Sequence, residues 1–332
     1  MYRNHTVGVV VPAHNEAPFV GEVIDTLPAF VDRVYPVDDA STDGTWEVLT
    51  ERAAPATDAV ATVADGGAEA DVRVVPLRHE TNQGVGAAIR TGYRRAHADG
   101  MDVVAVMDGD GQMDPEMLDR LVDPIVTGRA AYAKGNRLLS PSHRDGMSRW
   151  RLFGNALLTG LTRVASGYWT LMDSQNGYTA ISRHALETVD LDRLYDGYGF
   201  RNDLLVALNV ARLPVADVSI PAVYGEERSG IRYRSFVPRL SRLLLSGFLW
   251  RLRGRYLVRE FHPLVGLYVL SIVGLFTWAV QGLQTVRSRD AGPSEWPALV
   301  LLGLTSGIAA LLAMAFDVQA NDSLHVVVDR DD

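Results

Sequence analysis

The sequence predicts an α/β protein built on a parallel sheet and followed by a membrane-associated C-terminal part. Apolar runs such as VGVVV (7–11) are bounded by turn residues, which is typical of strands that are buried on both faces. Helical segments alternate with such runs over residues 6–110, and this succession predicts a parallel sheet with right-handed crossovers. Two later segments are apolar and long enough, at about 20 residues each, to cross a bilayer.

The individual elements follow from local patterns in the sequence. Strands are expected at residues 7–11, 31–39, 72–79 and 102–108. Helices are expected at about 17–27, from an N-cap at Thr42 or Asp43 onward, and at 86–100. The small and polar segment 53–71 predicts a surface loop. Helices at 114–126 and 149–166 and strands at 130–137 and 215–224 continue in mixed α/β style.

The C-terminal part predicts a membrane anchor. Segments 263–286 and 297–316 contain no formally charged residue, so two membrane spans are favoured over two buried core helices. The preceding stretch, 232–262, mixes arginine with leucine and aromatic residues, which predicts an amphipathic helix on an anionic membrane surface. Arginines beside a first span stay on the cytosolic side. We therefore expect a cytosolic domain over 1–231, a two-helix hairpin over 263–316 and a polar acidic tail over 317–332.

Composition excludes several classes of protein. The chain has no cysteine, so disulfides, thiolate metal sites and cysteine nucleophiles are absent. The formal net charge of -8 argues against a nucleic-acid-binding protein, which is normally basic. The apolar run before Pro12 is shorter than the hydrophobic core of a secretory signal, so we expect the N-terminal part to be cytosolic.

Three of the predicted strands end in residues that suit a ligand site. These are Pro12, His14 and Glu16 after the first strand, Asp38 and Asp39 after the second, and Asp108 and Asp110 after the fourth. One acidic residue at a strand end usually caps a helix. Because the carboxyl ends of parallel strands meet at one edge of a sheet, where ligands bind, three such ends together predict a site.

The stretch DGDGQ (108–112) has the residues to hold a hard divalent cation. Mg²⁺ and Mn²⁺ prefer oxygen ligands and are commonly shared between protein carboxylates and substrate phosphates. Asp108 and Asp110 would supply carboxylates, Gln112 a further oxygen, and the glycines would let the backbone approach closely. The cation would neutralise a leaving diphosphate. The alternative is an ordinary Asp-Gly turn after a strand.

Five ordered motifs carry a resemblance to a known family. They are PAHNEA (12–17), DDASTDGT (38–45), NQGVGAAIRTG (82–92), DGDGQ (108–112) and KGNR (134–137). Their order and spacing resemble family 2 glycosyltransferases, and most of all the dolichyl-phosphate mannose and glucose synthase branch. DSQNGY (173–178), YGFRNDLL (198–205) and YGEERSGIRY (224–233) resemble further elements of that branch. The resemblance covers about residues 6–235, and no QxxRW element of processive polysaccharide synthases follows.

The resemblance implies a GT-A fold, with a mixed, mainly parallel sheet and helices on both faces, and a nucleotide-sugar donor. Carried over by motif, the base and ribose contacts are Pro12, His14, Glu16 and Asp39, with Asp38 as an alternative to Asp39. Asp108, Asp110 and Gln112 would hold the metal ion and the diphosphate, with Asp110 essential for catalysis, and Arg137 would contact a phosphate.

The acceptor side is less sharply defined by the motifs. Asp203 matches the acidic position that is a catalytic base in many relatives, but a lipid phosphate is already anionic and needs no base. It would then position the metal or acceptor, or simply lie at a helix N-terminus. Asp173 would hold sugar hydroxyls or cap a turn. Arginine suits phosphate oxygens, so Arg228, Ser229 and Arg232 would bind the acceptor phosphate or be ordinary membrane-surface residues. The histidines His79, His97 and His143 are expected at the surface.

The expected function is therefore inverting transfer of a sugar, with Mg²⁺ or Mn²⁺, from a UDP- or GDP-sugar to a polyprenyl (dolichyl) phosphate. The reaction would take place at the cytosolic face of the cell membrane and serve glycan or protein glycosylation. Two alternatives remain open. One is transfer to a hydroxyl of a lipid-linked oligosaccharide, for which Asp203 would be an essential base. The other is a non-catalytic membrane scaffold that binds nucleotides.

Overall fold

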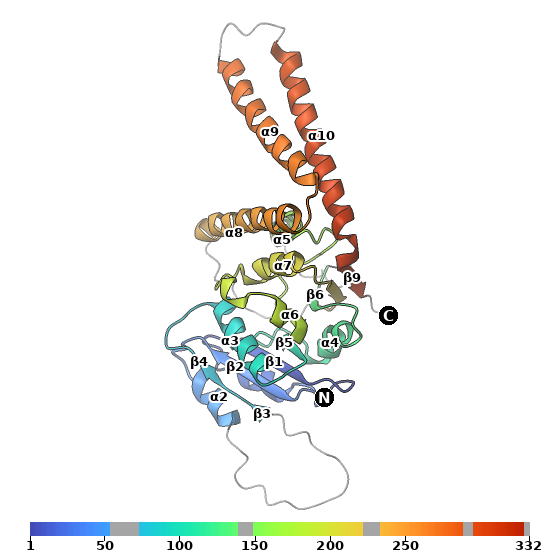
Figure 1. The fold of residues 1–332 in the computed structure, drawn as a ribbon. Helices are drawn as coiled ribbons and strands as arrows, with labels where there is room; N and C mark the ends of the chain where they lie inside the picture. Colours follow the sequence, from blue (N-terminus) through green and yellow to red (C-terminus); the bar gives the residue numbers. More distant parts are fainter. Residues whose placement is uncertain (54–72, 139–148, 222–232, 288–294, 329–332) are drawn as a thin grey trace, which may run out of the picture.

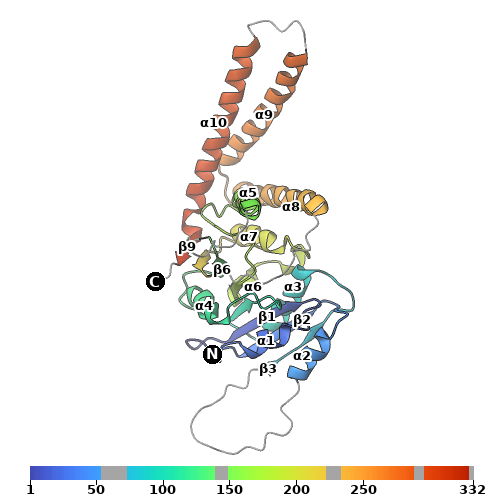
Figure 2. The ribbon, with the colours of Figure 1, turned by 180° about the vertical axis from the view of Figure 1, so that it is seen from behind.

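The computed structural model describes residues 1–53, 73–138, 149–221, 233–287 and 295–328. A nine-stranded sheet lies at one end of the molecule and two long helices project from the other (Figure 1, Figure 2). The strands are β1 Val7–Ala13, β2 Arg33–Asp38, β3 Arg73–Val74, β4 Leu77–Arg78, β5 Val103–Val106, β6 Tyr132–Asn136, β7 Thr179–Ser182, β8 Val215–Ser219 and β9 His325–Val328. Their order is β3-β2-β1-β5-β7-β6-β8-β9, and β4 also pairs with β2.

Ten α-helices are present in the described part of the chain. They are α1 Val20–Asp25, α2 Thr45–Ala53, α3 Val85–Ala98, α4 Leu118–Val126, α5 Arg149–Ser166, α6 Arg183–Thr188, α7 Phe200–Val210, α8 Tyr233–Arg253, α9 Leu264–Arg287 and α10 Glu295–Asn321. A π-helical turn, Gly254–Arg259, extends α8 toward α9. The predicted alternation of strands and helices is confirmed over the first part of the chain.

The predicted third strand differs from expectation. Residues 72–79 were expected as one strand, whereas β3 and β4 are two short pieces that pair separately with β2. Val75 donates its N–H to the carbonyl of Val34 at 2.8 Å. Pro76 has no N–H to donate to the ladder, so the pairing is interrupted there.

The middle of the sheet contains one antiparallel strand, which the sequence analysis did not identify. β7 runs antiparallel to both of its neighbours, and Thr179 lies opposite Val106 of β5 and Lys134 of β6. Because β7 is antiparallel to both β5 and β6, these two strands run in the same direction. The segment that leads into β7 therefore reaches the sheet edge at which β1, β2, β5 and β6 end.

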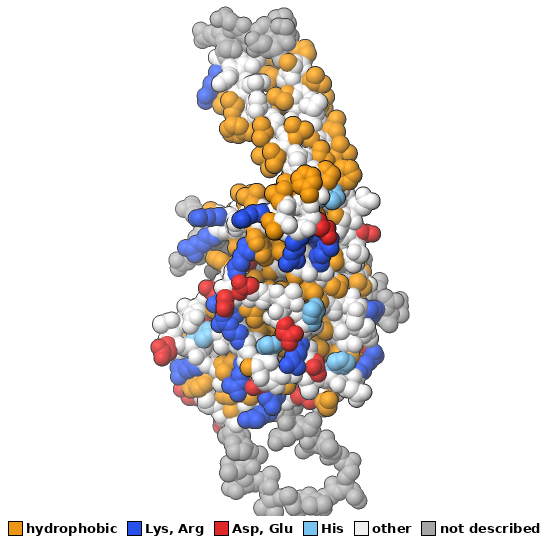
Figure 3. Space-filling view, in the orientation of Figure 1, with side chains coloured by type: hydrophobic (Ala, Val, Ile, Leu, Met, Phe, Trp, Pro, Cys, Tyr) orange, Lys and Arg blue, Asp and Glu red, His pale blue; other side chains and the backbone are white. Residues whose placement is uncertain are grey.

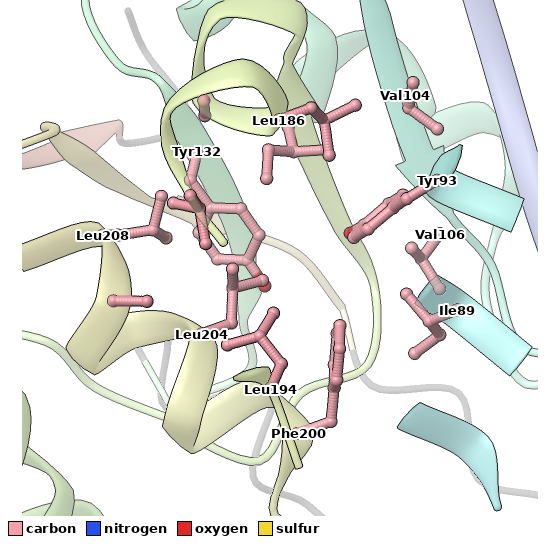
Figure 4. Packing of buried hydrophobic residues seen from close by; sticks show 14 of the residues in the cluster. Ile89, Tyr93, Val104, Val106, Tyr132, Leu186, Leu194, Phe200, Leu204 and Leu208 are labelled. Carbon is pink, nitrogen blue, oxygen red and sulfur yellow. The ribbon is translucent and has the colours of Figure 1, made fainter. Parts of the chain in front are cut away.

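Helices cover both faces of the sheet. On one face α3, α6 and α7 enclose an apolar cluster that includes Val106, Tyr93 and Phe200, and the centroids of the two rings are 6.4 Å apart (Figure 4). On the opposite face α1, α2 and α4 pack against the other side chains of β1, β2 and β5. Strands covered in this way must be apolar on both sides, which is why β1 and β5 read as continuous valine-rich runs.

The two C-terminal helices form an antiparallel hairpin. α9 and α10 are long and apolar enough to cross a membrane, by length and composition. They pack through small residues, with Gly274 against Ser306 and Gly303 against Trp278, as is common between membrane helices. Apolar side chains such as Phe276 and Leu311 point outward, and Figure 3 shows the apolar surface of the hairpin above arginines near α8.

A buried polar network fixes the base of this hairpin. Arg251 of α8 and Asp317 of α10 are both fully buried, and the guanidinium donates to both carboxylate oxygens at 2.8 and 2.7 Å. Tyr256 donates to the same carboxylate at 2.7 Å. Arg255 bonds the side chains of Asn209 in α7 and Asn321 in α10. The arginines of this segment were expected on the membrane surface, whereas Arg251 and Arg255 lie inside the protein.

The end of the chain also differs from the expected polar tail. The second long helix continues to Asn321, and residues 325–328 form β9, which pairs in parallel with β8. The run VVV at 326–328 is short and lies among acidic residues, which is why the composition of 317–332 predicted a polar acidic tail. Both ends of the hairpin are therefore attached to the sheet domain.

We expect Asp317→Asn to destabilise the protein by about 3–5 kcal/mol, because it leaves the buried Arg251 guanidinium without its charge partner. Thermal unfolding of the purified protein in detergent measures this. The control is Asp322→Asn, an exposed aspartate shortly after α10, for which a change within about 0.5 kcal/mol is expected. Equal effects of the two substitutions would contradict the role of the network.

Candidate active site

The candidate site lies at the edge where β1, β2, β5 and β6 end and β7 begins. The loops after β1 and β2 are bonded to each other at this edge. Asn15 donates its N–H to the hydroxyl of Ser41 at 2.9 Å, and Glu16 does the same to Thr45 at 2.9 Å. A ring nitrogen of His14 lies 2.9 Å from the carbonyl oxygen of Asp39. The sequence-predicted residues of these two loops are therefore brought together, with His14 exposed and Glu16 half-buried.

Asp39 is buried and holds the loop before α3. Its carboxylate accepts the N–H groups of Gln83 at 2.8 Å and Gly84 at 2.7 Å, and it lies 2.8 Å from Nδ1 of His79. Gly84 has φ of 96°, which favours glycine. His79 was expected at the surface, which is wrong: it is buried between Asp39 and the hydroxyl of Thr91. An aspartate at a strand end can be the partner of a buried histidine. The position of Asp39 was therefore a sequence signal that His79 could be buried.

Asp38, the alternative to Asp39 in the sequence analysis, is also buried. One carboxylate oxygen accepts the N–H of Ser41 at 3.0 Å, and the other lies 3.2 Å from Nε of Arg78. Arg78 is half exposed and also lies over the ring of Trp46. Both aspartates of the DD pair therefore bond protein groups that shape the rim of the site.

The DGDGQ segment leaves β5 next to the end of β1. Gly109 donates its N–H to the carbonyl of Pro12 at 3.2 Å, which joins this turn to the first strand. Asp110 accepts the N–H of Gln112 at 3.0 Å, and Gly111 has φ of 72°. Asp108 is half-buried, and both its oxygens lie near Nη2 of Arg201, at 3.0 and 3.2 Å. Arg201, in the first turn of α7, was not singled out from the sequence.

The donor set of this segment fits a hard divalent cation. Within the described residues, no group of three or more histidine, aspartate or glutamate side chains is arranged to hold a metal ion. The ligands on offer are oxygens: the carboxylates of Asp108 and Asp110 and the amide oxygen of Gln112. Mg²⁺ and Mn²⁺ commonly take one or two protein carboxylates and complete their coordination with substrate phosphates and water. The chemistry of these side chains therefore fits a cation that binds together with a diphosphate.

Arg137, directly after β6, and Asp173, in the segment before β7, bind each other. Arg137 donates Nε to one oxygen of the Asp173 carboxylate at 2.7 Å and Nη2 to the other at 3.0 Å. Burial opposes the charge on Asp173, but Arg137 and the nearby Lys134 outweigh that effect and lower the pKa of the carboxyl. Lys134, the only lysine in the chain, is buried and donates to the backbone carbonyl of Asp173. The sequence motifs placed Arg137 on the donor side and Asp173 on the acceptor side, whereas the structure joins the two side chains.

Asp203 lies away from Asp108. It accepts the N–H of Tyr195 at 3.0 Å, and burial raises the pKa of its carboxyl. Arg201 and Asp203 are two positions apart on α7, so their side chains leave the helix roughly 200° apart. Because Arg201 points to Asp108, Asp203 faces the loop before α7 instead. The remaining predicted acceptor residues, Arg228, Ser229 and Arg232, lie outside the described residues, as does His143.

The mixed, mainly parallel sheet, with helices on both faces and carboxylates at its strand ends, matches a GT-A-like α/β fold. The chain belongs to Glycosyl transferase family 2, which matches residues 8–190, more than half of its length. The resemblance of the sequence motifs to this family is therefore confirmed.

Three known relatives extend the match beyond the family region. UDP-N-acetylglucosamine–dolichyl-phosphate N-acetylglucosaminyltransferase of Methanococcus voltae is 27% identical over 219 residues, covering 66% of this chain and 86% of that protein. Undecaprenyl-phosphate mannosyltransferase of Micrococcus luteus is 29% identical over 231 residues, covering 67% and 84%. Polyprenol monophosphomannose synthase of Mycolicibacterium smegmatis is 29% identical over 259 residues, covering 74% and 87%.

The fold also matches a solved structure. Glucosyl-3-phosphoglycerate synthase from Mycobacterium tuberculosis, in complex with Mn²⁺, uridine diphosphate and glucosyl-3-phosphoglycerate, aligns with a TM-score of 0.52. The alignment covers 75% of this chain and 80% of that one at 22% identity. This likeness confirms the GT-A-like fold.

We expect Asp173→Asn to destabilise the protein by about 2–3 kcal/mol at pH 7, because it removes the charge partner of Arg137. The folded-state pKa of Asp173 is lowered, so its contribution is present above the unfolded value of about 3.9 and is lost as the pH falls below that value. Thermal unfolding at pH 7 and at about pH 3.5 should therefore show the difference from the unmodified protein shrinking in acid.

The matched control is Asp25→Asn, whose Arg52 partner makes the same two-nitrogen contact at the surface. A surface pair contributes at most about 1 kcal/mol. A difference for Asp173→Asn that stays constant between the two pH values would contradict the assignment.

Proposed function

We propose that the protein transfers a sugar from a nucleotide diphosphate sugar to a polyprenyl phosphate at the membrane surface. The observation that carries this proposal is that few elements lie between the sheet edge that bears Asp108 and the hairpin of α9 and α10. Arg201 of α7 pairs with Asp108, while Val206 of the same helix packs against Gly247 of α8. Helix α8 leads into α9, and Figures 1 and 2 draw α5 and α8 between the sheet and the hairpin. A lipid acceptor would therefore meet the donor with α7 and α8 between the sheet edge and the hairpin.

The relatives support the acceptor more strongly than the donor. Those from Methanococcus voltae, Micrococcus luteus and Mycolicibacterium smegmatis are named for dolichyl phosphate, undecaprenyl phosphate and polyprenol acceptors. Their sugars differ, since one transfers N-acetylglucosamine and two are named for mannose. The polyprenyl phosphate is the shared feature, and the donor is proposed only as a UDP- or GDP-sugar.

The proposed reaction is a single displacement with inversion. An anionic oxygen of the acceptor phosphate attacks the anomeric carbon, a new carbon–oxygen bond forms, and the bond to the donor diphosphate breaks as the nucleoside diphosphate leaves with the electron pair. Asp108, Asp110 and Gln112 would hold a divalent cation that neutralises the charge of the leaving group. Arg137, oriented by Asp173, would direct N–H groups toward a phosphate.

The loops at the rim of the site would hold the nucleotide. Pro12, His14, Glu16 and the Asp38–Asp39 pair line the part of the edge nearest β1 and β2. Because Asp39 is already bonded to the loop before α3, its proposed part is to fix that loop, while exposed His14 offers a ring to the base.

We further propose an integral membrane protein of the cell membrane whose sheet domain is cytosolic. Arginines such as Arg253 and Arg259 precede α9, which favours the cytosolic side for that end. Strand β9 follows α10 and joins the same sheet as β8, so the hairpin must return to the side from which it started. Two crossings satisfy both observations.

Asp110→Asn is expected to lower lipid glycosylation at least about a hundredfold, because losing a carboxylate ligand removes several kcal/mol of charge stabilisation. Asparagine can still accept the N–H of Gln112, so the turn is kept. The assay incubates membranes with labelled UDP- or GDP-sugars and polyprenyl phosphate and counts labelled lipid.

The control for this assay is Glu116→Gln, an exposed acidic residue six positions further on, which should leave the rate unchanged. Full activity of Asp110→Asn would reject the metal assignment. If no donor yields a lipid product with the unmodified protein, the proposed function is wrong.

Asp203→Asn should keep the rate of transfer to polyprenyl phosphate within about threefold, because an anionic acceptor needs no base and asparagine can still accept the N–H of Tyr195. The same labelled-lipid assay measures this. A loss of about a hundredfold with unchanged donor binding would instead favour a hydroxyl acceptor and a catalytic base.

A further inference from the structure

We propose that Arg201 is an internal counter-ion that occupies Asp108 until a divalent cation and a nucleoside diphosphate bind together. The inference rests on the proposed function, and it adds a residue of this chain that controls how the cation binds. In the resting protein Arg201 and a divalent cation would compete for the same carboxylate. The cation alone then binds weakly, and binding strengthens when a diphosphate offers the displaced guanidinium a new partner.

The contact geometry places the guanidinium where a cation would lie. A single nitrogen, Nη2 of Arg201, is 3.0 Å from Oδ1 and 3.2 Å from Oδ2 of Asp108. It therefore lies in front of both carboxylate oxygens, where a cation bound to Asp108 would also have to lie.

Two structural ion pairs elsewhere in the chain show what a permanent contact looks like. Arg137 binds Asp173 through two nitrogens on two oxygens, and Arg251 binds Asp317 in the same way. These forks use the strongest geometry available to arginine. Arg201 instead contacts Asp108 through one nitrogen, so less is lost when this pair separates.

A second feature of Arg201 points to another partner. Its Nε is buried and has no hydrogen-bond partner among the described residues. A buried donor left in this state is unfavourable. When a diphosphate enters beside Asp108, Nε and Nη2 would together present the planar fork that matches phosphate oxygens.

The surroundings hold the pair in place. Gly177, in the segment before β7, lies against both side chains, and an added Cβ there would meet Asp108 and Arg201. Arg201 is 16% exposed and Asp108 is 26% exposed, so their attraction is only partly screened by water. The charge of Arg201 therefore acts directly on any cation that approaches Asp108.

The test measures Mn²⁺ binding to the full-length protein in detergent, by the electron paramagnetic resonance signal of free Mn²⁺, with and without UDP or GDP. With no nucleotide, Arg201→Gln should bind Mn²⁺ at least about tenfold more tightly than the unmodified protein, because a nearby positive charge is removed. The factor by which the nucleotide strengthens Mn²⁺ binding should fall in the variant, since the two binding events are linked through Arg201.

Two further variants distinguish the loss of the positive charge at Arg201 from a general disturbance of the structure. Arg201→Lys keeps a positive charge and should bind Mn²⁺ within about threefold of the unmodified protein. Arg183→Gln breaks a surface pair with Glu187 on α6 and should change nothing. Thermal unfolding of each variant confirms that it is folded.

The outcomes are distinguishable. Unchanged or weaker Mn²⁺ binding by Arg201→Gln would overturn the inference, because Arg201 would then only orient Asp108. Equal tightening by Arg201→Lys would also overturn it. If the unmodified protein binds no Mn²⁺ even with UDP or GDP, both the inference and the metal assignment of the proposed function fail.

Discussion

The site depends on negative charge that is gathered at one edge of the sheet and compensated there. Parallel pairing of β1 with β2 and β5 brings Ala13 level with Asp38 and places Gly109, just after β5, beside Pro12. Carboxylates at one edge of a sheet repel one another unless cations or N–H groups approach them. Asp39 is compensated by two backbone N–H groups and His79, whereas Asp108 is compensated by Arg201. The first arrangement builds the loop, and the second leaves a carboxylate that a cation can take over.

A second constraint joins this edge to the hairpin. Helix α7 contacts Asp108 through Arg201 at its start and the hairpin base through Asn209 near its end. The buried pair of Arg251 and Asp317 would be costly to leave incomplete, so α8 and α10 are held in one orientation. In the proposed reaction, a lipid acceptor delivered along the hairpin would thus meet the donor site at a distance that these contacts of α7, α8 and α10 fix.

Much of this organisation was predictable from the sequence because it depends on local patterns. The valine-rich strands, the residues at their ends and the two long apolar helices all follow from periodicity and composition. The features that were not predicted depend on contacts between residues that are distant in the sequence. The antiparallel β7 is defined by Thr179 facing Val106 and Lys134, and β9 by its pairing with β8. Arg251 and Asp317 are 66 positions apart, so no local pattern distinguishes this buried arginine from exposed ones nearby such as Arg253.

The central claim is that Asp108 and Asp110 hold a divalent cation next to a nucleoside diphosphate. The most direct measurement is an anomalous difference map from crystals of the protein grown with Mn²⁺ and UDP or GDP. The account predicts a single strong peak at about 2.2 Å from oxygens of both carboxylates and from the diphosphate. A bound diphosphate with no peak between it and these two residues, or a peak held by other side chains, would contradict it.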